Sequence, residues 1–248
     1  AATSQRTSGD LLILEKDPDK KGPEIRAHLG VVPQQDLVDR ELKVWENLVT
    51  YGRYFGLPRK WLKTKVEELL EFAQLTDKRN EKADDLSGGM QRRLAIARGL
   101  INEPEILLLD EPTTGLDPIG SREMKDLILS LKKQGKTVLL CSHQLADVQD
   151  VCDRVAILDQ GELKELGRVT DLLKVQDVTE IHTKRLTPEV EAEIRAIIER
   201  EGGTCTIDNP TATMEDLFLN IVRESEARPG ARRVTGTGNS KEAADEGQ

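Results

Sequence analysis

Apolar residues recur at helical spacing over residues 36–99. Leu62, Val66 and Leu69, for example, fall on one face of a helix. A Gly-Leu-Pro break at residues 56–58 separates this helix from the helical pattern before it. We therefore predict a mostly helical subdomain over residues 36–99.

The segments on either side show the shorter apolar runs that are typical of buried strands. Residues 106–109 and 138–141 are two such runs, and a stretch with helical spacing follows each of them. Alternating strands and helices indicate an α/β fold with a parallel sheet. We predict one α/β core subdomain, made of residues 1–35 and 100–172, that carries the helical subdomain as an insertion.

Smaller elements complete the core. Residues 11–14 and 29–32 read as further strands, and the Asp-Pro-Asp-Lys segment at residues 17–20 reads as a turn. Residues 155–166 alternate around Gln160 and Gly161, which predicts a hairpin at the end of the main domain.

The C-terminal part changes character twice. Residues 173–222 are predicted to form a small α/β appendage, with one helix after Thr187 and a second after Thr213. Large apolar side chains then nearly vanish, so burial cannot offset the entropy of ordering. We therefore expect residues 223–248 to form a disordered tail.

Composition narrows the function classes. The 248 residues carry a net charge of -9, which opposes binding to a phosphate backbone, so we expect no nucleic-acid partner. No apolar run approaches the roughly 18 residues of a membrane span. The opening residues lack the pattern of a secretory signal, and the three cysteines form no Cys-x-x-Cys pair. These features favour a reducing, cytoplasmic location.

A Leu-Ser-Gly-Gly-Met-Gln segment stands at the start of a predicted helix. Ser87 supplies a hydroxyl, and Gly88 and Gly89 allow close backbone approach, so the free N–H groups and the positive end of the helix dipole can face an anion. Ser-Gly-Gly alone would more often be a capped helix after a turn. The longer run, through Gln91 and the following Arg-Arg-Leu-Ala-Ile-Ala-Arg, is far more specific.

Two adjacent carboxylates, Asp110 and Glu111, end the apolar run at residues 106–109. The carboxyl ends of parallel strands form the crevice where open α/β sheets bind ligands. His143 follows the next strand in the same way. Alone, each of these features has an ordinary structural explanation, but together with the Ser-Gly-Gly helix they indicate a site.

The Leu-Ser-Gly-Gly-Met-Gln run resembles the signature motif of ATP-binding cassette (ABC) ATPases, and residues 106–112 resemble their Walker B motif. Residues 113–117 are similar to the D-loop, His143 to the switch histidine and Gln34 to the Q-loop glutamine of the same family. The resemblance implies that Asp110 and Gln34 hold Mg²⁺, that Glu111 polarises the attacking water, and that His143 contacts the γ-phosphate of ATP. It also places Asp117, in Thr-Thr-Gly-Leu-Asp, at a dimer interface. The residues expected to contact nucleotide are Ser87, Gly88, Gly89, Gln91, Asp117 and Gln34.

One motif of that family is missing from these residues. A phosphate-binding loop needs Gly-x-x-x-x-Gly-Lys-Ser/Thr after a strand and before a helix, and no such pattern precedes Gln34. Gly135-Lys136-Thr137 has the reverse order, so we interpret Gly135 as the stop of a helix. We expect the fold to be an incomplete ABC-ATPase fold that begins beyond the loop's helix.

The resemblance implies the nucleotide-binding subunit of an ABC exporter. It would couple ATP hydrolysis to export in a head-to-tail dimer, as a homodimer or with a different ATP-binding subunit. It would sit at the inner face of the cell membrane through a transmembrane permease subunit. This chain alone would not hydrolyse ATP. Two alternatives stay open: a soluble ABC-class ATPase outside transport, and a non-hydrolysing module that lends its signature motif to a complete partner.

Overall fold

The structure is a computed structural model, and it describes residues 7–35, 38–174 and 183–207. The chain divides into two compact units, residues 1–178 and 179–248, and each is described by itself. Among the described residues, no helix is both long and apolar enough to cross a membrane.

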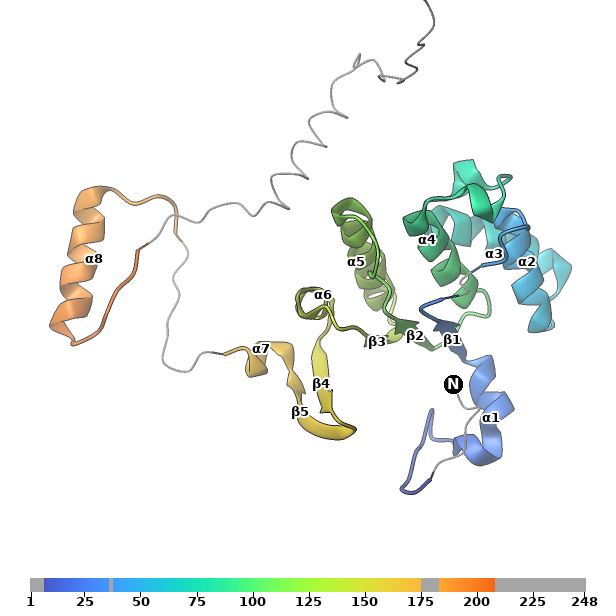
Figure 1. Cartoon of the computed structure of the whole chain (residues 1–248), viewed down its shortest axis with the longest axis horizontal. Coiled ribbons are helices and arrows are strands. Elements are labelled where there is room, and N and C mark those ends of the chain that lie inside the picture. Colours follow the sequence, from blue (N-terminus) through green and yellow to red (C-terminus); the bar gives the residue numbers. More distant parts are fainter. Residues whose placement is uncertain (1–6, 36–37, 175–182, 208–248) are drawn as a thin grey trace, which may run out of the picture. The chain divides into compact units, whose positions relative to one another are not determined.

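A parallel sheet lies at the centre of the first unit and confirms the predicted α/β fold (Figure 1). Its strands are β1 (Leu29–Val32), β2 (Ile106–Asp110) and β3 (Thr137–Cys141), in the order β1-β2-β3. Val32 lies opposite Leu109, and Asp110 lies opposite Cys141, so all three strands end at the same edge.

Three α-helices between β1 and β2 lie side by side (Figure 1). They are α2 (Val44–Tyr54), α3 (Arg59–Phe72) and α4 (Gly88–Gly99), with short 3₁₀ turns at Thr76–Lys78 and Ala83–Asp85. Leu94, Ile96 and Leu48 are fully buried among them. Arg92 and Arg93 are buried too, so α4 has almost no solvent face.

Helix α4 reaches the sheet through two glycines. A Cβ atom added at Gly30 of β1 would lie 2.2 Å from the carbonyl oxygen of Gly99, at the end of α4. Any larger residue at Gly30 would push the helix and the strand apart. This close approach fixes one end of α4 on the sheet while its other end remains free for a site.

The region before β1 differs from the prediction. Residues 11–14 form no strand, because Leu14 and Glu15 have positive φ angles of 51° and 61° and turn the chain back. The predicted turn is the start of helix α1 (Pro18–Ala27), whose N-cap Asp17 accepts a hydrogen bond from the Asp19 amide. The strand prediction was therefore wrong. Residues 17–20 do turn, with the Lys20 amide donating to the Asp17 carbonyl at 3.2 Å, but this turn continues into a helix that is kinked at Lys21.

After β2, the chain follows the expected alternation. Helix α5 (Pro118–Lys133) leads into β3, and α6 (Leu145–Val151) comes next. Lys125 of α5 forms an ion pair with Asp150 of α6, with 2.8 Å between nitrogen and oxygen. Gly135 has a φ angle of 77° just after α5, which supports its interpretation as a helix stop.

The predicted hairpin is confirmed. Strands β4 (Arg154–Asp159) and β5 (Glu162–Arg168) pair antiparallel, and the short helix α7 (Val169–Leu172) follows. In the second unit, helix α8 (Pro188–Arg200) starts after Thr187 as expected. The predicted helix after Thr213 and the predicted disordered tail lie outside the described residues.

Candidate functional site

The common edge of the three strands gathers the polar residues that the sequence singled out. Gln34 follows β1, Asp110 ends β2, Glu111 comes directly after it, and His143 lies two residues beyond β3. Residues from well-separated parts of the chain therefore share one edge of the sheet. This is the edge at which open α/β sheets bind their ligands.

Glu111 and His143 are in direct contact. The Glu111 Oε1 atom lies 2.8 Å from Nδ1 of the His143 ring and accepts a 3.1 Å hydrogen bond from the His143 backbone amide. An ionised carboxylate only accepts, so Nδ1 carries the proton in this pair. The His143 side chain is 69% exposed, and its second ring nitrogen remains available to a ligand.

The backbone at Glu111 is unusual. Its φ angle is 48°, a left-handed conformation that costs a non-glycine residue on the order of 1–3 kcal/mol. Its amide donates to the Cys141 carbonyl at 2.9 Å, and the Thr114 hydroxyl donates to its Oε2 at 2.8 Å. These bonds hold Glu111 in this conformation and direct its carboxylate toward His143.

The same contacts control the protonation of Glu111. The hydrogen bond from His143 is the main cause that lowers the pKa of the Glu111 carboxyl, and Thr114 adds to it while partial burial opposes it. Glu111 is therefore a carboxylate at neutral pH, and its lone pairs can accept a proton. Because the pKa is lowered in the folded state, the stabilisation is present above the ordinary glutamate pKa of about 4.3 and is lost as pH falls through the folded value.

We expect His143→Ala to raise the pKa of Glu111 toward its ordinary value, because the largest cause of the shift is removed. Carboxyl ¹³C chemical shifts followed over a pH titration measure this change directly. Glu103 is the internal control, because its pKa is lowered chiefly by Lys65 and should not move. An unchanged Glu111 titration would show that the contact with His143 does not govern its protonation.

The signature segment forms the start of α4. The Ser87 hydroxyl oxygen caps the helix by accepting from the Met90 amide at 3.3 Å. A Cβ atom at Gly88 would meet nothing within 4 Å, so the space at this helix end is open to a ligand. Leu116 of the D-loop segment approaches to 3.9 Å of a Cβ placed at Gly89. The two segments therefore adjoin within one subunit.

Gln91 and Asp117 have local partners in this structure. The Gln91 side-chain amide donates to the carbonyl oxygens of Ala83 (2.9 Å) and Leu86 (3.3 Å) and so holds the segment that leads to Ser87. Asp117 caps α5 by accepting from the Gly120 amide at 2.7 Å. In this conformation both side chains shape the loops that carry the site.

Two side chains that the motifs did not single out also belong to this region. Thr114 binds the Glu111 carboxylate, and its position three residues after Glu111 was the available signal. Arg92 donates hydrogen bonds to the backbone beside Gln34. No sequence signal showed that this arginine points inward, because arginines on helices are usually exposed.

The donor set fits a nucleotide with its cation. The structure places no group of three or more His, Cys, Asp or Glu residues that could hold a metal within the described ranges. Mg²⁺ needs only one or two carboxylates when phosphate oxygens and water supply its other ligands. The Asp110 carboxylate and the Gln34 amide oxygen, both exposed, are ligands of this kind.

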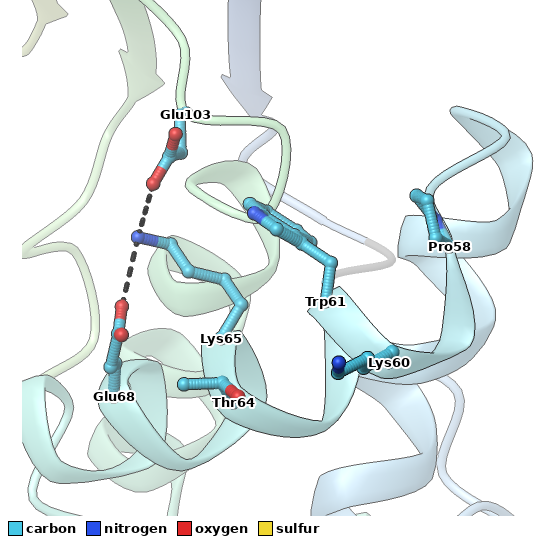
Figure 2. Close-up of a pocket in the computed structure, with 7 residues that line it drawn as sticks. All are labelled: Pro58, Lys60, Trp61, Thr64, Lys65, Glu68 and Glu103. Atoms are coloured by element: carbon cyan, nitrogen blue, oxygen red, sulfur yellow. Dashed lines mark hydrogen bonds and ion pairs between the residues drawn. The ribbon is translucent and has the colours of Figure 1, made fainter.

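A surface pocket of about 500 Å³ lies elsewhere, on the helical subdomain (Figure 2). Trp61 forms one wall, and Lys65 donates to both Glu68 and Glu103 across it (Figure 2). Glu103 precedes β2, whereas Asp110 ends it, so the pocket belongs to the opposite end of that strand. It is separate from the site at the strand ends.

A parallel α/β sheet with an open helix N-terminus and a carboxylate–imidazole pair fits the class of nucleotide-binding domains. The sequence profile of the family described as "ABC transporter" matches residues 1–114. The Nod factor export ATP-binding protein I of Cupriavidus metallidurans is 35% identical over 240 residues, covering 86% of this chain and 79% of that protein. The chain therefore belongs to the ABC transporter family as an ATP-binding subunit.

A second curated relative and two solved structures also belong to ABC ATP-binding proteins. The Nod factor export ATP-binding protein I of Cupriavidus pinatubonensis is 36% identical over 239 residues, covering 86% of this chain and 73% of that protein. Among solved structures, cbiO1 of Clostridium perfringens, part of the ABC transporter complex cbiONQ, has a TM-score of 0.65 at 26% identity, with 81% of this chain and 77% of that chain covered. The ATP-binding cassette MJ0796, a dimer bound to ADP and Pi, has a TM-score of 0.59 at 28% identity, covering 68% and 76%.

Proposed function

We propose that the protein hydrolyses Mg-ATP in a head-to-tail dimer and couples this reaction to export through a membrane permease. The observation that supports this most directly is the contact between Glu111 and His143 at the strand ends. The contact keeps the Glu111 carboxylate ionised and oriented at this edge, where it can accept a proton from water. Similarity to two Nod factor export proteins favours export as the direction.

Each residue at the strand ends has a separate role in this reaction. Asp110 and Gln34 hold Mg²⁺, which offsets phosphate charge when it is bound. Glu111 accepts the proton of the attacking water. The second ring nitrogen of His143 faces solvent and contacts the terminal phosphate. The Oε2 atom of Glu111 accepts one hydrogen bond, from Thr114, so its second lone pair can accept from the attacking water.

The exposed start of α4 serves the nucleotide of a second subunit. Ser87 and Gly88 are exposed, whereas α4 is buried from Arg92 to Ala97. In a head-to-tail pair, this helix end faces the terminal phosphate bound by the partner, with Asp117 between the two sites. A permease would hold the pair at the inner face of the cell membrane. None of residues 173–222 matches a motif of the nucleotide site, so we expect them to take no part in hydrolysis.

The test uses an extended chain, in which a relative's strand, phosphate-binding loop and helix precede these 248 residues. We expect Ser87→Arg to reduce ATP hydrolysis by about 10²-fold or more, because its bulk and the loss of the hydroxyl disrupt electrostatic contact with the phosphate. Phosphate release is measured on Ser87→Arg subunits mixed with Glu111→Gln subunits. A head-to-tail site predicts that the mixture recovers activity, because one site of each mixed dimer then combines an intact Glu111 with an intact Ser87 from the other subunit.

Thr64→Arg is the matched control, because it adds the same side chain on the exposed face of α3. It should leave turnover unchanged. Mixtures of Ser87→Arg and Glu111→Gln subunits that recover no activity would contradict the shared site.

A further inference from the structure

Arg92 joins the signature helix to the backbone beside Gln34. It lies on α4, five residues after Ser87, and its side chain is buried. Its Nη1 atom donates to the carbonyl oxygens of Pro33, at 3.3 Å, and Gln34, at 3.1 Å. Both acceptors belong to the segment that leaves β1, so the contact spans two elements far apart in the chain.

The carboxylates of the site act on the same guanidinium. Burial lowers the pKa of Arg92, while the negative charges of Asp110 and Glu111 raise it. An arginine nevertheless stays charged at any physiological pH. Arg92 therefore interacts with the Gln34 backbone through hydrogen bonds and with both carboxylates through its charge.

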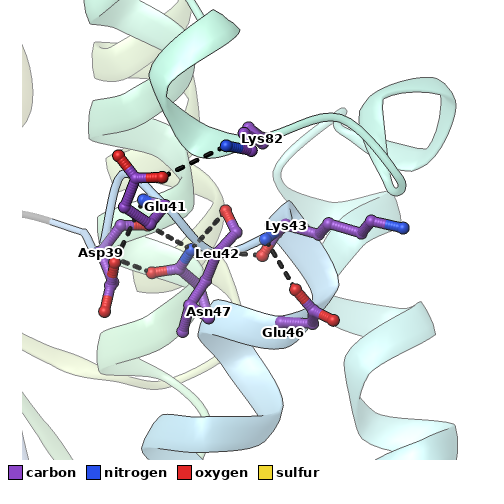
Figure 3. A network of polar contacts seen from close by, with 7 residues as sticks. All are labelled: Asp39, Glu41, Leu42, Lys43, Glu46, Asn47 and Lys82. Atoms are coloured by element: carbon purple, nitrogen blue, oxygen red, sulfur yellow. Dashed lines mark hydrogen bonds and ion pairs between the residues drawn. The ribbon is translucent and has the colours of Figure 1, made fainter.

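The far end of the same segment is held independently by a second buried side chain, Asn47 of α2 (Figure 3). Its Oδ1 accepts from the Asp39 amide at 2.8 Å, and its Nδ2 donates to the Asp39 carbonyl at 2.9 Å (Figure 3). Nδ2 also lies 3.2 Å from the Lys43 carbonyl oxygen. The segment is thus attached to α4 at its start and to α2 at its end.

We propose that Arg92 is a positioning residue for hydrolysis: it holds the backbone of Gln34 against α4, so that Gln34 and the signature helix keep one relative placement. The proposal rests on the proposed function, since that function assigns Gln34 to the metal. Arg92 itself does not touch the nucleotide. Its loss should therefore lower kcat and leave KM for Mg-ATP nearly unchanged.

The first measurement needs no nucleotide. In the 248-residue chain, the carbonyl ¹³C resonances of Pro33 and Gln34 report directly on the two hydrogen bonds. We expect both to shift in Arg92→Gln and to stay in place in Arg154→Gln, which makes the same change at an exposed position on β4. Unmoved carbonyl resonances in Arg92→Gln would overturn the proposal.

The second measurement is steady-state hydrolysis by the extended chain. We expect Arg92→Gln to lower kcat by about 10- to 100-fold, since small displacements of positioned groups have effects of this size. KM should stay within about twofold. Arg92→Lys keeps a charged donor and should recover part of the rate. Activity equal to that of Arg154→Gln, or a loss seen only in KM, would contradict the positioning role.

Two further results separate failure of the Arg92 proposal from failure to fold and from failure of the proposed function. If Arg92→Gln does not fold, Arg92→Met keeps the length of the side chain, removes every donor and is judged by the same two readouts. If the wild-type extended chain shows no hydrolysis, the proposed function fails. The carbonyl shifts then still decide whether Arg92 holds Gln34.

Discussion

Glu111→Gln in the extended chain is expected to lower ATP turnover by about 10²- to 10⁴-fold, the usual contribution of a general base. An amide cannot accept the proton of the attacking water. It keeps the shape of the carboxylate, and its oxygen can still accept from Thr114 or His143. The fold and the nucleotide affinity should therefore persist.

Two measurements separate the effects. Phosphate release gives the rate, and calorimetric titration with Mg-ATP gives the dissociation constant, which should change by less than about threefold. Glu165→Gln, on the exposed strand β5, is the control for the loss of one carboxylate. Steady turnover above about one tenth of the wild-type rate would rule out Glu111 as the principal base.

The 248-residue chain by itself is expected neither to hydrolyse ATP at a measurable rate nor to bind it tightly. Most phosphate affinity in phosphate-loop proteins comes from backbone N–H groups that act together with a lysine. The tripeptide Gly135-Lys136-Thr137 has the residue types that end a phosphate-binding loop, but it has another role here. Gly135 follows the end of α5, and Lys136 donates to the Pro104 carbonyl at 2.8 Å.

Titration of monodisperse protein with Mg-ATP, together with a phosphate-release assay, tests this expectation. We expect a dissociation constant weaker than about 1 mM, or about -4 kcal/mol of binding free energy. The extended chain is the positive control. Micromolar binding with steady turnover by the 248 residues alone would reveal a phosphate site that the motifs do not show.

Much of the fold was predictable because apolar residues recur along the sequence at the spacing of the helix or strand that they occupy. The apolar runs of β2 and β3 and the helical spacing of α5 predicted a parallel α/β sheet. Burial follows the pattern in β2 and α5, whereas no residue of β3 is buried in this structure. The segment before β1 was not predictable in this way. Asp17 and Pro18 suit both a turn and a helix start, and the chain continues from them into a helix that is kinked at Lys21 and buries Ile25.

The sequence predicted which residues of the site lie at one edge of the sheet, because parallel strands end at the same edge. Its internal contacts were not. The left-handed backbone of Glu111 turns its carboxylate toward His143, and alternation along a strand cannot predict such a turn. Arg92 and Asn47 were missed for a related reason, because burial of a polar side chain depends on partners from other elements.

The pairing of β1 with β2 has a consequence for how the protein folds. Leu29 pairs with Ile106, and α2, α3 and α4 lie between them in the chain. Forming this pair first would close a long loop at a large cost in chain entropy. Helix packing among α2, α3 and α4 shortens that loop before the strands meet. We therefore expect these helices to be structured in the folding transition state and the β1–β2 pair to form after them.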